Sequence, residues 1–288
     1  MLVTVWGCRG SIASPGYDTL RYGGESSCFE VRTDDGGLIV IDAGSGIRKL
    51  GAKLLREPGP REMVLLLTHS HWDHPAGFPF FRPAFVPGTT ISLCGGADAQ
   101  DSILKSLQHE MEPPYFPVDM SAMKAAFVKG CRCGRAECDH RLPGAQGDHA
   151  CDSIPLSHPN GGYGYRITGK SGRAFVLLTD NELEYRHETG RSRDDYVEFC
   201  RGADLLFHDA QYTDDEYEKT RTWGHSTFKA AVDFAIEAGV RRLGLLHHDP
   251  DRTDDEIDAI VRWCKDCIRE KNSALECFAC AEGLTLEV

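Results

Sequence analysis

The chain lacks the sequence features that would place it in or across a membrane. It contains no apolar run of roughly 18 or more residues, so no membrane-spanning helix is expected. Residues 1–6, Met-Leu-Val-Thr-Val-Trp, have neither the basic start nor the apolar core of a signal peptide, and they suit a first strand. These absences predict a cytoplasmic protein that does not bind membranes.

An excess of positive charge is also absent. The 32 Lys and Arg residues are outnumbered by 44 Asp and Glu residues, which gives a formal net charge of −12. This balance disfavours extensive binding to nucleic acid, because phosphates require basic partners. A small anionic substrate is compatible with it, since bound metal ions reverse the field locally.

The sequence has no internal repeat of fixed period, and its hydrophobic fraction of 41% is enough for a sizeable core. Strands are expected at 2–6, 28–33, 38–42, 63–68, 89–93, 162–168, 173–179, 204–208, 242–247, 275–279 and 284–288, and helices at 45–56, 97–111, 194–201, 226–238 and 254–270. Ser226 or Thr227 and Asp254 are expected to cap helices, and Gly239 to end one. The pattern predicts an α/β protein with one domain over residues 1–288. A Cys-, Pro- and Gly-rich insertion is expected at about 112–150.

The most informative motif is H-x-H-x-D-H, formed by His69, His71, Asp73 and His74. It follows the apolar run 63–67, so all four side chains belong to one loop after a strand. Neutral imidazole and carboxylate suit Zn²⁺, Mn²⁺ or Fe. Because one short loop cannot easily direct four groups at a single tetrahedral ion, we expect two nearby ions. A solvated His-rich loop is the disfavoured alternative.

Three further candidates also lie at strand ends. His158 follows the apolar run 154–156, Asp180 follows 175–179, and His247 follows 243–246. Sites in layered α/β proteins form where strands end, so these residues are expected to converge on the His69 loop. A surface His and a turn Asp are the alternatives for His158 and Asp180. His248 competes with His247, which lies directly at the strand end.

This set of residues resembles the metallo-β-lactamase fold superfamily. Residues 6–11 (WGCRGS) and 41–46 (IDAGSG) contribute to the resemblance, while residues 224–227 (GHST) with the later Leu-x-Leu-x-His resemble its ribonuclease Z and cyclic nucleotide phosphodiesterase branch. The resemblance implies a four-layer αββα sandwich with two metal ions, expected to be Zn²⁺ with Mn²⁺ or Fe as alternatives. It assigns His69, His71 and His158 to the first ion, Asp73, His74 and His247 to the second, and Asp180 to a bridging position.

The chemistry expected of such a site is attack by a metal-bound hydroxide. Two ions can lower the pKa of a bridging water from 15.7 to about 7. Asp73 is expected to orient this hydroxide as well as bind metal, and His225 to donate a proton to the departing alkoxide. Alternatively, His225 is only a helix-start residue. Asp42 is expected to brace the ligand loop, and His208 with Asp209 to form a structural pair.

The predicted reaction is hydrolysis of a phosphodiester. Ribonuclease Z enzymes carry a basic arm that grips RNA, and no matching basic arm is evident, so a small substrate such as a cyclic nucleotide is favoured. The alternatives are a thioester or lactone hydrolase, a ribonuclease Z-like RNA endonuclease, and a non-hydrolytic iron redox or binding protein. A homodimer is compatible with the sequence. Candidate phosphate contacts are Arg191, Arg193 and Arg221, although surface Arg residues are more commonly just solvated. Candidate residues of a base pocket are Phe78, Phe80, Phe81 and Phe85, although core packing is the more common role for most of them.

Seven of the 12 cysteines fall into two groups. Without an export signal, thiols or metal thiolates are expected rather than disulfides. Cys131, Cys133, Cys138 and His140 have the spacing of an additional structural Zn²⁺ site, with His149 or Cys151 as alternate ligands and a loop of reduced thiols as the competing interpretation. Cys264, Cys267, Cys277 and Cys280 have similar spacing. However, they fall on a predicted helix and strand, where alternation separates Cys277 from Cys280, so they are expected to be buried apolar residues.

Overall fold

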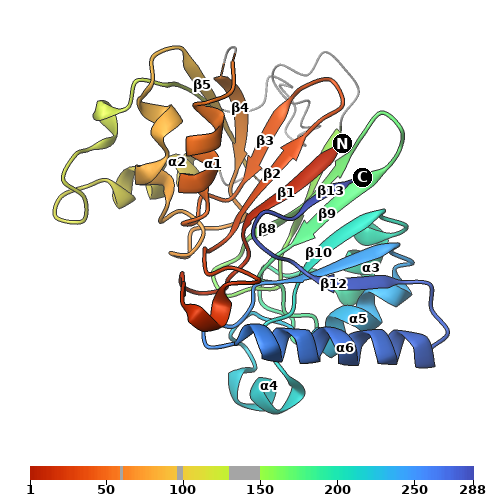
Figure 1. Ribbon diagram of the computed structural model, residues 1–288. Coiled ribbons are helices and arrows are strands. Elements are labelled where there is room, and N and C mark those ends of the chain that lie inside the picture. The colour runs from red at the N-terminus through yellow and green to blue at the C-terminus, as the bar shows by residue number, and fades with distance from the viewer. Residues whose placement is uncertain (59–60, 96–99, 130–149) are drawn as a thin grey trace.

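The computed structural model describes residues 1–58, 61–95, 100–129 and 150–288. Two β-sheets face each other, and helices lie on the outer side of each sheet (Figure 1). The first sheet has the order β13 (Thr285–Glu287), β1 (Leu2–Gly7), β2 (Cys28–Arg32), β3 (Leu38–Ile41), β4 (Arg61–Leu66), β5 (Thr89–Cys94), β6 (Ala126–Lys129). The second has the order β12 (Glu276–Ala279), β11 (Arg242–Leu246), β10 (Leu205–Asp209), β9 (Ala174–Leu178), β8 (Tyr163–Thr168), β7 (Ala150–Pro155).

The helices are divided between the two sheets. Helices α1 (Ile47–Leu54) and α2 (Gln100–Glu110) cover the first sheet, while α3 (Arg193–Cys200), α5 (Phe228–Glu237) and α6 (Asp254–Glu270) cover the second. Helix α4 (Asp214–Thr220) lies at one end of the molecule. Short 3₁₀ turns occupy Tyr17–Thr19, Phe78–Phe80, Arg82–Phe85 and Met120–Ala122. Within the described residues, no helix is long and apolar enough to span a membrane.

Three hydrophobic clusters correspond to the three interfaces between these layers. Side chains of both sheets, including Val5, Phe29 and Phe207, form the central cluster. A second cluster joins β9–β11 to α3, α5 and α6, and a third joins β3–β5 to α1 and α2. Period-two alternation directs successive strand residues to opposite clusters. The predicted four-layer αββα sandwich is therefore confirmed.

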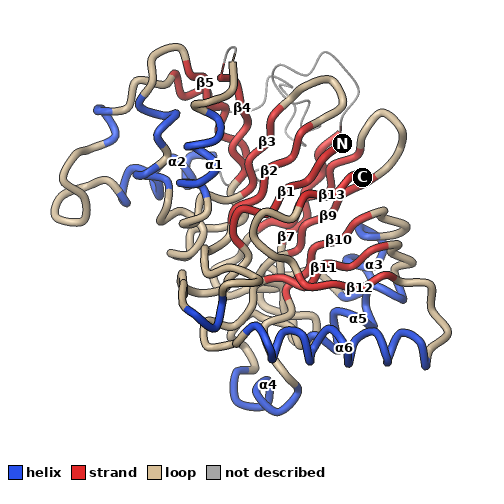
Figure 2. Tube along the Cα trace, viewed as in Figure 1, coloured by secondary structure: helices blue, strands red, loops and turns tan. Residues whose placement is uncertain are grey.

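The strand directions bring the loops of interest to one end of the sheets. Strands β3 to β6 are parallel to one another, as are β9 to β12, whereas β13, β1, β2, β7 and β8 pair antiparallel. Parallel strands carry their carboxyl ends to the same edge. Long loops gather there, as the tan segments of Figure 2 show.

Most predicted elements occur within a few residues of their expected limits, but three elements were not predicted. Helix α4 has no buried residue, so it lacks an apolar period. Strand β6, with four residues, and strand β7, with six, lie at the edges of their sheets. Both fall at least partly within the expected insertion at 112–150, and β6 pairs with β5 in the first sheet.

The helix ends confirm two expectations and correct one. Thr227 caps α5 by accepting from Ala230 N, and Gly239 follows the helix with φ of 64°. The prediction of Asp254 as a cap is wrong, because Thr253 is extended and accepts from Glu256 N. Asp254 is instead the first residue of α6, and its buried carboxylate accepts from the backbone N–H of Arg21 at 2.7 Å.

Candidate metal centre

The seven residues predicted as metal ligands lie together where the two sheets meet. His69, His71, Asp73 and His74 lie on the loop that follows β4, and His158 follows β7. Asp180 lies two residues after the end of β9, and His247 comes directly after β11. Their ligand atoms form two neighbouring groups, in each of which all atoms lie within 4.8 Å of one another. Thus residues separated by up to 178 positions share one site.

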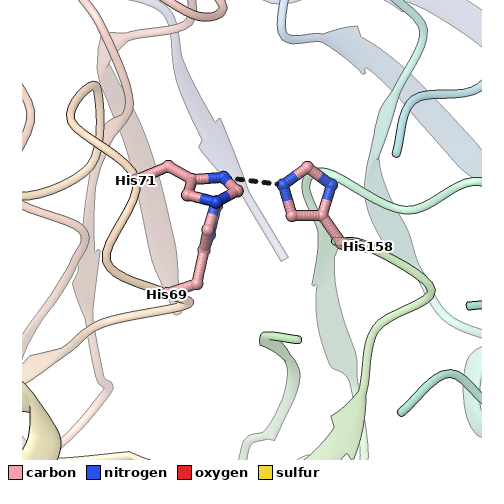
Figure 3. A group of neighbouring side chains, drawn as sticks. All are labelled: His69, His71 and His158. Carbon is pink, nitrogen blue, oxygen red and sulfur yellow. Dashed lines mark hydrogen bonds between the residues drawn. The ribbon is translucent and has the colours of Figure 1, made fainter. Parts of the chain in front are cut away.

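The first group consists of His69, His71 and His158. Figure 3 shows the rings of His71 and His158 facing each other, with His69 beside His71. His71 Nδ1 lies 2.9 Å from His158 Nε2. His69 Nε2 lies 3.6 Å from Asp180 Oδ2, which connects this group to the second one.

The second group consists of Asp73, His74, Asp180 and His247. His74 Nε2 lies 3.2 Å from Asp73 Oδ2 and 3.3 Å from Asp180 Oδ1. His247 Nε2 lies 3.1 Å from Asp73 and 3.3 Å from Asp180. Burial opposes ionisation of Asp180, but the surrounding imidazoles of His247, His74 and His69 hold its pKa well below the usual range. Asp180 is therefore a carboxylate placed between the two groups.

Contacts outside the cluster fix the orientation of three imidazoles. The Nδ1 atom of His74 lies 2.8 Å from Asp42 Oδ2. The Nδ1 atom of His158 lies 2.9 Å from Gly224 O, and the Nδ1 atom of His247 lies 2.9 Å from Gln211 Oε1. Each Nδ1–H therefore donates outward, and each Nε2 presents a lone pair to the cluster. His248 donates to Cys280 O at 2.9 Å instead, so His247 is the histidine that faces the site.

The donor set fits metal ions. The Nε2 atoms of His69 and His74 are buried, and neither makes a well-aligned hydrogen bond among the described residues, although carboxylate oxygens lie 3.2–3.6 Å away. His71 Nε2 lies 3.2 Å from Asn160 Oδ1, so His71 donates its N–H away from the cluster, as His158 does to Gly224 O. The two nitrogens that lie 2.9 Å apart, His71 Nδ1 and His158 Nε2, therefore both carry lone pairs unless one ring gains a proton. A buried polar atom without a partner is unfavourable, and cations shared by these nitrogens would satisfy all of them.

Backbone strain is concentrated at the same place. Asp42, Asp180 and His247 have φ of 61°, 49° and 60°, a left-handed conformation that is uncommon for residues other than glycine. All three follow buried strands and direct their side chains toward the cluster. Such strain persists only where surrounding contacts determine the conformation, and it is concentrated at functional sites.

His225 lies beside the cluster on its other side. Its ring stacks on that of His247 with centroids 4.7 Å apart, and its Nδ1 donates to Asp209 Oδ2 at 2.6 Å. The Asp209 side chain is fully buried and also accepts from Ser226 N at 3.2 Å. Asp209 thus orients His225, whereas His208 turns into the core beside Phe234.

Two hollows flank the cluster. One, with a volume of about 400 Å³, is lined by side chains that include His69, His71, Ile103, Asn160 and Tyr163. The other, about 490 Å³, has a lining that includes Ser11, Tyr212, Trp223, His225, Asp249 and Asp251. The part of the chain that the structure describes contributes neither Lys nor Arg to either lining.

Other predicted candidates lie away from the cluster or outside the described residues. Arg193 pairs with Glu237 at 3.0 Å, and Arg221 lies over the Tyr185 ring. Phe78 and Phe81 are buried in the core, Phe85 packs against it, and Phe80 is exposed. Cys277 and Cys280 belong to different core clusters, as expected from strand alternation. Cys131, Cys133, Cys138, His140 and His149 lie outside the described residues.

Several residues of the site were missed by sequence reasoning. Gln211 orients His247, and the backbone N–H of Ser11 donates to Asp73 Oδ2 at 2.9 Å. The buried carboxylate of Glu182 lies behind the His225 loop. A polar residue shortly after a predicted strand was a usable signal for Gln211 and Glu182. Ser11 ends the WGCRGS motif at 6–11, but that motif did not indicate a contact to Asp73.

Comparison with known proteins agrees with this architecture. A model of the beta-lactamase superfamily domain matches residues 38–248, more than half of the chain. A ribonuclease Z from Kineococcus radiotolerans is 26% identical over 255 residues, covering 74% of this chain and 74% of that protein. The metallo-beta-lactamase fold protein YhfI from Bacillus subtilis has a TM-score of 0.66 at 19% identity, covering 100% of this chain and 98% of its own. A diphosphatase from the PhnP family has a TM-score of 0.63 at 20% identity, covering 100% of this chain and 97% of its own.

The structural neighbours are too distant in sequence to show more than the fold. The family match, however, spans strands of both sheets and includes all seven residues of the cluster. It confirms the resemblance predicted from the H-x-H-x-D-H motif and the strand-end residues. The chain therefore belongs to the β-lactamase superfamily and has the metallo-β-lactamase fold.

Proposed function

We propose that this protein is a two-metal-dependent phosphodiesterase that acts on a small phosphodiester. The observation that carries the proposal is the convergence of seven imidazole and carboxylate groups beside His225, which a buried carboxylate orients. The similarity to proteins named ribonuclease Z and diphosphatase supports hydrolysis at phosphorus.

The proposed ligand assignment follows the two groups. His69, His71 and His158 would hold one Zn²⁺, Asp73, His74 and His247 would hold the other, and Asp180 would contact both. Mn²⁺ and Fe are alternatives, because imidazole and carboxylate accept all three metals. When bound, two such ions supply a nucleophilic water at neutral pH and offset the charge on phosphate oxygens.

The chain's own residues then orient water and move a proton. The Asp73 carboxylate would orient the attacking water as well as hold metal. The His225 Nδ1–H is held by Asp209 Oδ2 at 2.6 Å, which leaves Nε2 free to carry the proton that the departing alkoxide needs. A positioned general acid contributes roughly 10²–10⁴-fold to the rate.

The hollows support a small substrate. Polynucleotides are held mainly by Lys and Arg contacts to several phosphates, and the described linings contain neither residue. Asp249 and Asp251 lie in the hollow beside His225, where a further phosphate on the leaving group would be repelled. A diester with one phosphate between neutral groups, such as a cyclic nucleotide, fits these linings best.

RNA is the second candidate substrate. The similarity to the ribonuclease Z from Kineococcus radiotolerans favours RNA, since the alignment covers 74% of this chain and 74% of that protein. A comparison of kcat/KM for 3′,5′- and 2′,3′-cyclic nucleotides with that for a structured RNA decides between them. Higher kcat/KM on the RNA would contradict the proposal of a small substrate while leaving the phosphodiesterase class intact.

The first test of the reaction class is hydrolysis of bis(p-nitrophenyl) phosphate by the zinc- or manganese-loaded protein. Wild type should turn over, and Asp73→Ala should abolish turnover. Asp152→Asn, an exposed change on β7, should leave turnover unchanged. No turnover by metal-replete wild type would contradict the proposal. A panel of thioesters and lactones, together with iron analysis, would then test the ester hydrolase and redox alternatives.

A further inference from the structure

The loop between α4 and α5 carries both His225 and a contact to the cluster. Gly224 O accepts from His158 Nδ1 at 2.9 Å, and His225 is the next residue. The loop passes so close to His158 that a Cβ on Gly224 would lie 2.0 Å from that nitrogen. The position of this loop therefore decides where His225 lies relative to the cluster.

The first half of this loop is strained and is poorly anchored by its own side chains, whereas His225 and Ser226 in the second half bond to Asp209 Oδ2 at 2.6 Å and to Asn181 O at 2.5 Å. Thr222 has φ of 76°, an outlier for a β-branched residue, and Gly224 has φ of 96°. Trp223, between them, is 61% exposed, so burial of its ring does not hold the loop in place. A strained conformation of this kind persists only if other contacts impose it.

The contacts that impose the conformation of Thr222 and Gly224 converge on one carboxylate. Glu182 Oε1 accepts from Thr222 N at 2.8 Å and from Tyr217 Oη at 2.7 Å. Glu182 Oε2 accepts from Gly224 N at 2.9 Å and from His187 Nε2 at 2.8 Å. Glu182 is only 1% exposed. Hydrogen bonds to an ionised acceptor are about twice as strong as neutral ones, so four of them make a firm anchor.

The backbone of Glu182 is fixed to the other side of the site. Its N–H donates to Ser157 O at 2.8 Å, and Asn181 Oδ1 accepts from Ser157 N at 2.9 Å. Asp180 lies two residues earlier in the chain. Glu182 therefore connects the rigid segment that carries Asp180 and the residue preceding His158 to the strained loop that carries His225.

We propose that Glu182 is a positioning residue that holds His225 in place for proton donation. This inference rests on the proposed phosphodiesterase activity, in which His225 protonates the departing alkoxide. Glu182 touches neither the cluster nor the two hollows. It reaches His225 through the backbone N–H groups of Thr222 and Gly224.

The test uses substrates that differ in their need for an acid. A p-nitrophenolate leaving group departs without protonation, whereas an alkoxide such as a ribose oxygen requires it. Glu182→Gln places an N–H₂ group, which cannot accept, against two of the four donors. We expect kcat on an alkyl or nucleoside phosphodiester to fall about 10- to 100-fold, part of the full contribution of a general acid. KM, kcat on bis(p-nitrophenyl) phosphate and bound metal should change little.

Two further variants sharpen the result. Glu188→Gln makes the same change of charge at an exposed position of the neighbouring loop and should behave as wild type. His225→Ala should show the same selectivity for leaving groups as Glu182→Gln, and adding Glu182→Gln to it should cause little further loss on the alkyl substrate. Equal losses on both leaving groups, or loss of metal from Glu182→Gln, would overturn the inference.

A measurement without substrate separates this inference from the proposed function. Trypsin can cleave after the exposed Arg221, at the start of the loop. Glu182→Gln should be cleaved there faster than wild type, and Glu188→Gln should not. Absence of any phosphodiester turnover by wild type would refute the proposed function alone, whereas unchanged cleavage at Arg221 would refute the anchoring role of Glu182.

Discussion

At the scale of single residues, the candidate site depends on the contacts that orient each imidazole. Asp42 is a clear case. It is fully buried at the end of β3, and its two carboxylate oxygens accept from His74 Nδ1, Thr68 N and Thr68 Oγ1 at 2.8–3.0 Å. It therefore fixes the His74 ring and the beginning of the ligand loop together, and no part of it reaches the hollows.

Asp42→Asn is expected to weaken zinc binding. An amide in place of the carboxylate removes charge from the His74 contact and turns one acceptor into a donor. Loss of such an orienting contact typically lowers metal affinity 10- to 100-fold. Competition for zinc against a chromogenic chelator measures the effect, with the exposed Asp152→Asn as control. Equal affinities for wild type and Asp42→Asn would refute this role for Asp42.

At the scale of secondary-structure elements, a buried carboxylate joins a strand to a helix. Glu30 of β2 is buried beneath α1, and it accepts from Lys53 Nζ at 2.9 Å, Trp6 Nε1 at 2.9 Å and Arg32 Nε at 2.6 Å. Burial alone would raise the pKa of Glu30. The hydrogen bonds from Arg32, Lys53 and Trp6 outweigh burial and lower this pKa below its ordinary value of 4.5.

The effect of Glu30→Gln on stability should therefore depend on pH. Because the folded-state pKa is lowered, the ionised form stabilises the fold fully above pH 4.5, and this contribution disappears as the pH falls through the folded-state pKa. At pH 7 the variant should lose about 1–3 kcal/mol of unfolding free energy.

Urea unfolding of both proteins at pH 7 and at a series of acidic values tests this. The difference between wild type and Glu30→Gln should shrink steadily below pH 4.5. A difference that stays constant over the whole range would mean that packing, rather than the charge of Glu30, stabilises the contact between β2 and α1.

At the scale of the whole molecule, the cluster joins the two halves of the sandwich. His69, His71, Asp73 and His74 follow a strand of the first sheet, whereas His158, Asp180 and His247 follow strands of the second. Metal ions bound by residues from both sheets would connect the two sheets at the end of the sandwich where the ligand loops lie. Metal binding should therefore contribute to the stability of the complete fold.

Chelation is expected to lower the melting temperature. A ligand that binds only the folded state at 100 times its Kd stabilises it by about 2.7 kcal/mol, which corresponds to several degrees in a protein of this size. Differential scanning calorimetry with zinc or with EDTA measures the shift. Asp180→Ala, which removes the residue shared by both groups, should shift much less. An unchanged melting temperature after proven metal removal would show that the ions do not stabilise the sandwich.

The family, the layered fold and the seven residues of the cluster could be predicted from the sequence. Four of the seven share one loop after a predicted apolar strand, and the other three follow apolar runs further along the chain. The resemblance that these residues carry implied the family and the layered fold. Short elements without an apolar period, such as α4 and β6, carried no comparable signal. The tertiary structure alone decided which polar groups stand behind the cluster. Gln211, Ser11 and Glu182 act through contacts to residues 36, 62 and about 40 positions away, and no local pattern encodes such distances.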